Sequence, residues 1–269
     1  MTDLTGKVAV VLGASAEGGT GWAVAEALAG HGAKVVVGAR SLAPLKRLAE
    51  RIGGTALQCD AGEEAEVAAL AQGAIRTYGK LDIAVNSAGL PVQGPISKAT
   101  TAQLQAGVAV NYFGQVYFIK YMAEVMQPGG SIIIISSISS THPDGNFFAY
   151  GCAKAATNCL VRYAALEYGP KGIRVNAVLP GPIDSHMTAG ALRAEPMRRA
   201  FEKEIPLGRI GEPRDFADVA LWLAGPAYVT GLNLQVNGGM HLCRFPYLRE
   251  LPGGAAAFGE GLPLGDRGS

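Results

Sequence analysis

Short apolar runs and longer Ala-rich segments alternate along most of this chain. The apolar runs have the length and β-branched composition of buried strands, and they lie at Val8–Leu12, Val35–Ala39, Ala56–Asp60, Ile83–Asn86, Ile132–Ser136, Ile173–Val178 and Asn233–Val236. The clearest predicted helices between them are Trp22–His31, Leu42–Ile52, Glu64–Tyr78 and Ala153–Tyr168. Continuous apolar strands separated by helices indicate a mostly parallel sheet of about seven strands, covered on both faces. The pattern predicts one doubly wound α/β domain of the Rossmann type over residues 1–239.

This periodicity ends after Gly239, and residues 240–269 follow neither a helical nor a strand pattern. We interpret them as a C-terminal tail and not as a second domain. The first part of the tail carries Phe245, Tyr247 and Leu248, and an exposed tail rarely leaves so much apolar surface uncovered. We expect it to pack on a neighbouring subunit or to close part of that subunit's active site; a flexible tail is the alternative.

Composition and charge exclude several classes of protein. A chain that is 49% hydrophobic and 17% charged is unlike a disordered protein. A net charge of +1 without basic runs gives no electrostatic footprint for nucleic acid or an anionic membrane. No apolar run approaches the roughly 18 residues of a membrane span, and the N-terminus shows no hydrophobic signal region. We expect a soluble, cytoplasmic protein.

The four cysteines have no spacing typical of a disulfide framework or a zinc site; they are Cys59, Cys152, Cys159 and Cys243. We expect all of them to be reduced, buried thiols. No cluster of His, Asp and Glu has the spacing of metal ligands, so we predict no metal site.

A glycine-rich loop, Gly13-Ala14-Ser15-Ala16-Glu17-Gly18-Gly19-Thr20-Gly21, joins the first strand to the first helix. Glycines let the backbone approach a pyrophosphate, and a helix N-terminus offers it free N–H groups. In this position the loop predicts a dinucleotide site at Gly13, Ser15, Gly19 and Gly21. An ordinary turn is the alternative.

The end of the second strand bears on the choice of dinucleotide. NAD-selective sites usually place a carboxylate there, whereas this chain has Ala39 followed by Arg40. An arginine can pair with a 2′-phosphate and stack on adenine. We therefore favour NADP(H), with NAD(H) held by backbone groups as the alternative. Glu17 in the loop would repel a phosphate if it pointed inward.

Tyr150 and Lys154 stand four residues apart, which places them on one face of a helix. A phenol has a pKa of about 10, and a nearby ammonium lowers that pKa toward the range of a general acid/base. A surface Tyr–Lys pair is the alternative. Ser137 follows a buried strand, at the edge where open parallel sheets bind ligands. Ser137 and Tyr150 are therefore expected to meet over one bound carbonyl.

Taken in order, these motifs resemble the short-chain dehydrogenases/reductases over about residues 5–239. The resemblance rests on the glycine loop, Asp60, Asn86-Ser87-Ala88-Gly89, Asn111, Ser137, Tyr150-x-x-x-Lys154 and Pro180-Gly181. It implies that Tyr150 exchanges a proton with the substrate oxygen and that Ser137 polarises that oxygen. It also implies that Lys154 binds the nicotinamide ribose and lowers the phenol pKa, and that Asn111 holds a water in the proton relay.

The same resemblance implies further cofactor contacts and a substrate lid. The implied cofactor contacts are Asp60 on adenine, Asn86, Ala88 and Gly89 along the cofactor, Tyr150 and Lys154 at the ribose, and Pro180, Gly181, Ile183 and Ser185 at the carboxamide. Compared with the family pattern, the glycine loop is two residues longer, and Leu12, Ser87, Ser185 and Asn237 replace its commoner residues.

The lid is expected at about residues 183–205, opposite the loop before Tyr150. Aromatic and methionine side chains in these segments predict an apolar or cyclic substrate, with candidate contacts at His142, Phe147, Phe148, His186 and Met187. The phenylalanines could instead pack the lid or an interface, and lone histidines are often structural.

These features predict an NADP(H)-dependent oxidoreductase that interconverts a secondary alcohol and a ketone, as a homo-oligomer, dimeric or tetrameric by resemblance. Reduction of a 3-oxoacyl thioester is the first alternative; it would use basic groups near the lid, for which Arg193, Arg198, Arg199 and Lys203 are candidates. A protein that senses NADP(H) without turnover is a further alternative, which the complete set of catalytic residues disfavours.

Overall fold

The computed structural model describes residues 2–143, 146–184, 192, 194–247 and 250–251. The strands are β1 (Val8–Leu12), β2 (Lys34–Ala39), β3 (Thr55–Gln58), β4 (Ile83–Asn86), β5 (Ser131–Ile135), β6 (Arg174–Pro180) and β7 (Asn233–Val236). They form one parallel seven-stranded sheet in the order β3-β2-β1-β4-β5-β6-β7. This confirms the predicted doubly wound fold.

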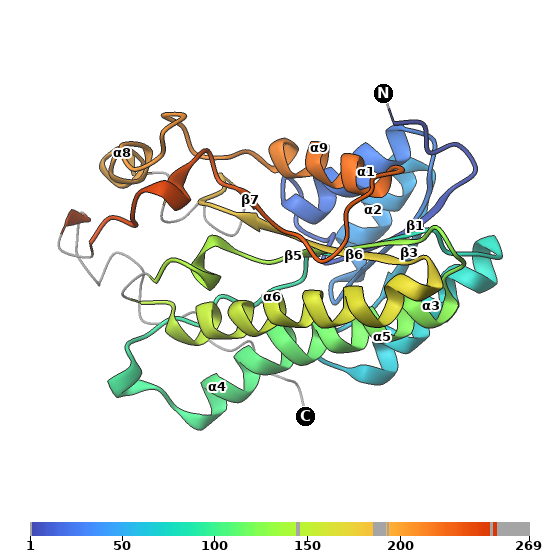
Figure 1. Cartoon of the computed structure of the whole chain (residues 1–269), viewed down its shortest axis with the longest axis horizontal. Helices are drawn as coiled ribbons and strands as arrows, with labels where there is room; N and C mark the ends of the chain where they lie inside the picture. Colours follow the sequence, from blue (N-terminus) through green and yellow to red (C-terminus); the bar gives the residue numbers. More distant parts are fainter. Residues whose placement is uncertain (1, 144–145, 185–191, 193, 248–249, 252–269) are drawn as a thin grey trace.

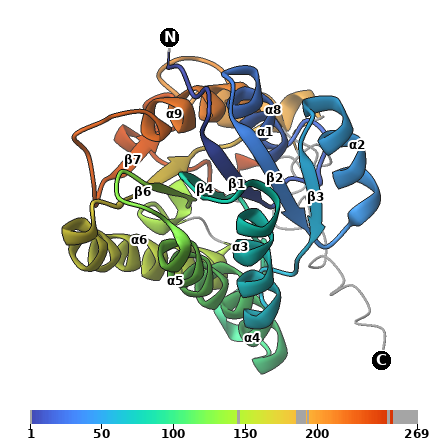
Figure 2. The ribbon, with the colours of Figure 1, turned by 90° about the vertical axis from the view of Figure 1, so that its right-hand side faces the viewer.

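Helices cover both faces of this sheet (Figures 1 and 2). One layer contains α1 (Thr20–Gly30), α2 (Leu42–Ile52) and α9 (Pro213–Ala224), and the other contains α3 (Glu64–Tyr78), α5 (Gly114–Val125) and α6 (Phe148–Tyr168). Alternate residues of β1 point into the two cores: Val11 packs with the first layer and Val10 with the second. The central strands β1, β4 and β5 are therefore buried along their whole length, because neither of their faces meets water, whereas the edge strands β3 and β7 are only partly buried.

The order in which the strands are added to the sheet reverses at β1: β2 and β3 lie on one side of it, and β4 to β7 lie on the other. Leu12 pairs with Gly38 of β2 on one side and with Asn86 of β4 on the other. Since β2 and β4 continue to opposite ends of the sheet, β1 and β4 flank the topological switch point, where open α/β sheets bind ligands.

Two further helices, α4 and α8, lie toward the carboxyl ends of the strands (Figure 1). α4 (Thr101–Val108) runs through a π-helical turn at Ala109–Phe113 into α5, and α8 (Glu195–Glu202) lies within the expected lid. No described helix combines the length and apolar character that crossing a bilayer requires.

The C-terminal tail does not extend away from the domain where it is described. Met240 and Leu251 are buried, together with Met197 and Phe201 of α8. The Phe245 ring meets the Phe201 ring edge-on, with centroids 6.4 Å apart. The first part of the tail thus covers α8 of its own chain, within the expected lid. Packing on a neighbouring subunit stays a prediction, for which Leu242 and Tyr247 remain exposed.

The expectation of four buried thiols is wrong for three of them. All four cysteines are free, but only Cys59 is fully buried, and burial raises its thiol pKa to about 12. Cys152 and Cys243 are exposed and Cys159 is half-buried. The α6 residues that face the core include Ala153, Thr157 and Val161 instead, so the two cysteines of α6 lie off that stripe.

Candidate active site

Two glycines of the loop, Gly13 and Gly21, stand where a side chain would not fit. A Cβ atom built on Gly13, whose φ is +88°, would lie 2.5 Å from the backbone N of Ala88. One built on Gly21 would lie 2.4 Å from the carbonyl O of Gly13. Gly19 is the N-cap of α1 without a side-chain cap, which leaves first-turn N–H groups for an anion. Ser15 lies half-buried in the same loop.

Arg40 projects from the end of β2 into solvent. Its side chain makes no hydrogen bond or ion pair within the described part of the chain. The Glu17 carboxylate lies 3.9 Å from Nη2 of Arg47 on α2, and both side chains are exposed. Glu17 is thus directed toward a cation of α2, so its charge is partly offset where a phosphate would bind.

Lys154 is the most buried charged residue near the sheet edge. Its side chain is 2% exposed, and Nζ donates to the carbonyl O of Ile135 at 2.8 Å. Nζ also lies 5.6 Å from the centroid of the Tyr150 ring. Burial lowers the pKa of Lys154 to about 8, because the charged form loses its hydration. The predicted Tyr150–Lys154 pair is therefore brought together on α6, with the ammonium below the phenol ring.

The turn that follows β5 packs directly on the first turn of α6. Ser137 lies at the start of this turn, and its Oγ accepts a hydrogen bond from the Ser139 N–H at 3.1 Å. Gly151, next to Tyr150, permits the close approach, since a Cβ there would lie 2.7 Å from the Ser139 carbonyl O. Ser137 and Tyr150 consequently belong to one packed unit, as expected for two groups that share a substrate oxygen.

Asn111 joins this unit from the π-helical turn. Its side-chain amide bonds both backbone groups of Leu90, with Oδ1 at 3.0 Å from N and Nδ2 at 2.7 Å from O. A Cβ on Gly89 would lie 3.4 Å from Asn111 Oδ1 and 3.8 Å from Lys154 Nζ. Gly89 therefore keeps a narrow space open between the amide and the ammonium.

The remaining expected cofactor contacts follow the same sheet edge. Asp60 Oδ1 accepts a hydrogen bond from the Gly62 N–H at 2.9 Å, just beyond β3. Pro180 ends β6, and Gly181 packs so tightly on Asn237 that a Cβ would lie 2.8 Å from the Asn237 Cβ. Ile183 forms a bridge with Gly211. Ser185, His186 and Met187 lie outside the described residues.

On the substrate side, the ring of Phe147 meets the Tyr150 ring at an angle of 70°, with centroids 6.4 Å apart. Phe148 begins α6 and is half-buried. His142 Nδ1 lies 3.0 Å from Thr141 Oγ1, at the end of the Ser137 turn. These three predicted contacts therefore lie between Ser137 and Tyr150 along the chain.

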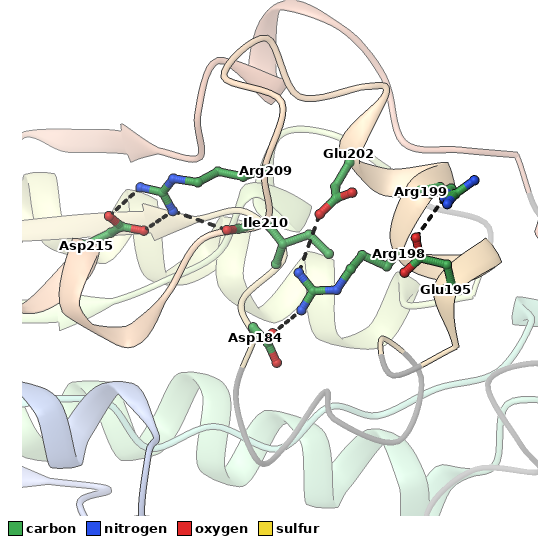
Figure 3. A network of polar contacts seen from close by, with 8 residues as sticks. All are labelled: Asp184, Glu195, Arg198, Arg199, Glu202, Arg209, Ile210 and Asp215. Atoms are coloured by element: carbon green, nitrogen blue, oxygen red, sulfur yellow. Dashed lines mark hydrogen bonds and ion pairs between the residues drawn. The ribbon is translucent and has the colours of Figure 1, made fainter.

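Helix α8, within the expected lid, carries its charges in pairs (Figure 3). Arg198 bridges Asp184, at the start of the lid, and Glu202 on its own helix. Arg199 pairs with Glu195 at 2.8 Å. The basic side chains of this helix are thus largely neutralised by neighbouring carboxylates.

Sequence reasoning missed two supporting residues of the site, Thr157 and Asn158. Thr157 Oγ1 lies 2.8 Å from the carbonyl O of Asn111. Asn158 accepts from Ser136 Oγ at 2.6 Å and donates to Ser140 Oγ at 2.7 Å. Both are buried polar residues three and four positions after Lys154. Continuing the Tyr150–Lys154 face by one helical turn would have found them.

The residues at this edge fit a nicotinamide dinucleotide. Asn86 is fully buried, and its Nδ2 has no partner among the described residues, while its Oδ1 accepts from the Ala88 N–H. Lys154 Nζ makes one hydrogen bond of the three that an ammonium can donate. Buried donors without acceptors are costly, and the oxygen atoms of a bound dinucleotide supply acceptors.

The chain is similar to known proteins over most of its length. Residues 13–241 match the family model described as Enoyl-(Acyl carrier protein) reductase. The chain is 36% identical to 3beta-hydroxysteroid dehydrogenase 1 of Eggerthella lenta, over 89% of this chain and 95% of that protein. It is 34% identical to 7alpha-hydroxysteroid dehydrogenase of Escherichia coli K12, over 88% and 94% respectively.

A solved dehydrogenase/reductase from Sinorhizobium meliloti 1021 superposes with a TM-score of 0.82 at 33% identity, covering 88% of this chain and 96% of that one. The chain belongs to the short-chain dehydrogenase/reductase family and is an oxidoreductase acting on CH–OH groups with NAD(P).

Proposed function

We propose that this enzyme interconverts a secondary alcohol and a ketone on an apolar, cyclic substrate, with NADP(H) as its cofactor. The observation that carries the proposal is the buried Lys154 ammonium, 5.6 Å from the Tyr150 ring on a helix packed against the Ser137 turn. A phenol, an ammonium and a hydroxyl in this arrangement can exchange a proton with a carbonyl oxygen and hold that oxygen in place.

Side chains of the protein supply the proton that passes to the ketone oxygen and stabilise the charge that remains on the phenolate. Tyr150 gives its phenolic proton to the ketone oxygen during reduction and takes it back during oxidation. The Ser137 hydroxyl hydrogen-bonds the same oxygen and fixes its orientation. Lys154, with a pKa of about 8, is mostly protonated at pH 7, so its charge stabilises the phenolate. When bound, the nicotinamide cofactor supplies or accepts the hydride at the substrate carbon.

Asn111 completes the path by which the proton reaches solvent. Its side chain is held at both ends by Leu90, and Thr157 Oγ1 contacts its carbonyl O. A residue fixed so firmly can hold a water between the ammonium and the outside. This is the role proposed for Asn111.

Two observations support a cyclic substrate. Phe147 presents its ring edge-on to Tyr150, so an aromatic surface lies beside the reacting group. Two relatives at 36% and 34% identity are named hydroxysteroid dehydrogenases. Hydroxysteroids and their ketones are therefore the first substrates to test.

We expect a polycyclic hydroxysteroid to be oxidised with a kcat/KM about tenfold or more above that of a linear secondary alcohol of similar polarity. The measurement is the change in absorbance at the nicotinamide wavelength with purified protein and both cofactors. A 3-oxoacyl thioester is the comparison substrate. Faster turnover of that thioester than of any cyclic ketone would overturn the proposal.

The charges of the lid disfavour the thioester alternative. Of the four basic residues considered for an acyl carrier, Arg193 lies outside the described residues, and Arg198 and Arg199 pair with carboxylates of the lid segment. Lys203 lies 3.9 Å from Glu204. A carrier phosphate would have to compete with these carboxylates for each of the described cations.

Cofactor preference tests the role of Arg40. We expect NADPH to bind about tenfold or more tightly than NADH, because an unpaired guanidinium at the end of β2 can bind the 2′-phosphate. Arg40→Ala should remove this difference with little effect on NADH. Fluorescence titration of the wild type and the variant with NADPH and NADH measures these affinities.

Arg51→Ala is the matched control, since Arg51 is also exposed, in the last turn of α2, and pairs with Glu26. It should leave both affinities unchanged. A wild-type preference for NADH, or an Arg40→Ala variant that still prefers NADPH, would contradict the assignment.

A further inference from the structure

A closed ring of hydrogen bonds runs through the turn that carries Ser137. Ser136 Oγ lies 2.6 Å from Asn158 Oδ1, and Asn158 Nδ2 lies 2.7 Å from Ser140 Oγ. Ser140 Oγ lies 2.5 Å from the carbonyl O of Ser137, and the peptide bond between Ser136 and Ser137 closes the ring. Ser136, Ser137 and Asn158 are all buried. The turn is therefore tied to α6 by side-chain hydrogen bonds as well as by packing.

The hydrogen bonds of the ring all run in one direction. A carbonyl oxygen cannot donate, so the Ser140 hydroxyl gives its proton to Ser137 O. The Ser140 oxygen then accepts from Asn158, which places the NH₂ group of the amide on that side. Asn158 Oδ1 consequently faces Ser136 and accepts its proton, since the other acceptor, Lys154 O, is farther away at 3.5 Å. Asparagine suits this position because its side chain accepts at one end and donates at the other.

The backbone that this ring holds also directs the Ser137 side chain. Ser137 Oγ accepts the N–H of Ser139 at 3.1 Å, so the hydroxyl keeps its own proton for an acceptor such as a ketone oxygen. The Ser137 carbonyl accepts the N–H of Ser140 as well, at 3.2 Å. Without the Ser140 hydroxyl, this longer bond would be left to hold the carbonyl, and the turn would be freer to rotate.

Asn158 links the ring to the helix that carries the proposed acid/base. Tyr150, Lys154 and Asn158 follow one another at intervals of four residues on α6, so they lie along one face. Lys154 Nζ donates to the carbonyl O of Ile135 at 2.8 Å, and Asn158 accepts from the next residue, Ser136. Two successive residues where β5 ends are thus bonded to two successive turns of α6. The same helix face therefore carries the phenol and holds the turn beside it.

We propose that Asn158 is a positioning residue that acts through Ser137. Together with Ser136 and Ser140, it holds the Ser137 hydroxyl where the substrate oxygen also meets Tyr150. The inference rests on the proposed function and adds to it a residue that touches neither substrate nor cofactor in the proposed mechanism. Its effect should fall on the chemical step, because a displaced hydroxyl leaves the substrate oxygen misaligned during hydride transfer.

Hydrogen exchange of the cofactor-free protein tests the ring without any turnover. Ser140→Ala and Asn158→Leu are each expected to speed exchange of the Ser139 amide about tenfold, because the turn loses its tie to α6. Ser140 is only half-buried, so its replacement by alanine should leave the fold intact. Exchange at the wild-type rate in Ser140→Ala would show that the ring does not hold the turn, and would overturn the proposal.

Ser131→Ala is the matched control. Ser131 Oγ also donates to a backbone carbonyl, that of Leu223 at 2.8 Å, and it is buried at the opposite end of β5. Its loss should lower stability but leave both kcat and the exchange of the Ser139 amide unchanged. A general loosening of the domain would instead appear in this variant as well, and would contradict a specific role for the ring.

Kinetics with a cyclic ketone and NADPH test the functional role. Ser140→Ala is expected to lower kcat about tenfold, with KM changed by less than about twofold and NADPH affinity unchanged. Ser140→Thr keeps a hydroxyl that can donate to Ser137 O, and it should restore most of the wild-type kcat. Wild-type kcat in Ser140→Ala would mean that the ring has only a structural role.

The decisive comparison is Asn158→Leu in the Ser137→Ala background, measured by single-turnover kinetics. A residue that acts through Ser137 should have little further effect on kcat once that hydroxyl is gone. An equal fall in kcat in both backgrounds would overturn the proposal. If the wild type reduces no ketone, the proposed function fails, whereas hydrogen exchange still decides whether the ring holds the turn.

Discussion

Replacing Tyr150 with phenylalanine is expected to lower kcat by about a thousandfold and to leave NADPH binding nearly unchanged. The variant loses the phenolic proton that passes to the substrate oxygen. It keeps the ring that packs beside Phe147 and lies above Lys154. Single-turnover kinetics and fluorescence titration measure the two properties on the same protein.

Tyr163→Phe is the matched control, because Tyr163 lies on the same helix with its side chain exposed. It should keep wild-type kcat and stability. Retained turnover in Tyr150→Phe would contradict the assignment of the acid/base. Loss of NADPH binding in that variant would show that the ring change had disturbed the site.

Replacing Lys154 with methionine is expected to abolish most activity and to stabilise the cofactor-free protein at neutral pH. The pKa of Lys154 is lowered from 10.5 to about 8 by burial. Below pH 8 the Lys154 side chain is charged in both the native and the unfolded state. The native state then bears the full cost of burying that charge, about 3 kcal/mol. Methionine removes this cost but leaves Ile135 O without its donor, so we expect a net gain of about 2 kcal/mol.

The sign of the pH dependence follows from the same shift. Between about pH 8 and 10.5 the native state releases the proton while the unfolded state keeps it, so the wild-type free energy of unfolding rises with pH. The advantage of Lys154→Met should therefore shrink across this window. Urea denaturation of the cofactor-free proteins at pH 7 and pH 10 measures it.

Lys34→Met changes an exposed lysine at the start of β2 and provides the control. Its free energy of unfolding should differ from that of the wild type by the same small amount at both pH values. A Lys154→Met variant less stable than wild type at pH 7 would contradict the inferred cost of the buried ammonium. The expected result would show that stability is given up at Lys154 for the sake of function.

Much of the fold follows from local pattern. Strands buried on both faces, such as β1 and β5, read as unbroken apolar runs, and the glycine loop stands at the turn where a parallel sheet begins. Helix starts were harder to predict. α6 begins at Phe148, five residues before the predicted start, because its N-cap, Phe147, has no capping side chain to mark it.

The candidate site was predictable only where sequence neighbours share a function. Tyr150 and Lys154 lie on one helix face, so their spacing gave a chemical pairing. Asn111 came from the resemblance alone, because its place in a π-helical turn depends on packing against Leu90 and α6. The hydrogen bond between Gln235 and Thr141 was invisible in the sequence, since the two residues lie 94 positions apart.

The tail that covers α8 also affects how the protein is made. Met240, Phe245 and Leu251 follow the strands of the sheet along the chain, so a ribosome adds them later, and they cover the apolar side of α8. A nascent chain that ends at Gly239 already contains the complete sheet and the proposed catalytic side chains, but exposes Met197 and Phe201 to water. Premature termination in this interval should thus yield an aggregation-prone protein and not a shorter enzyme.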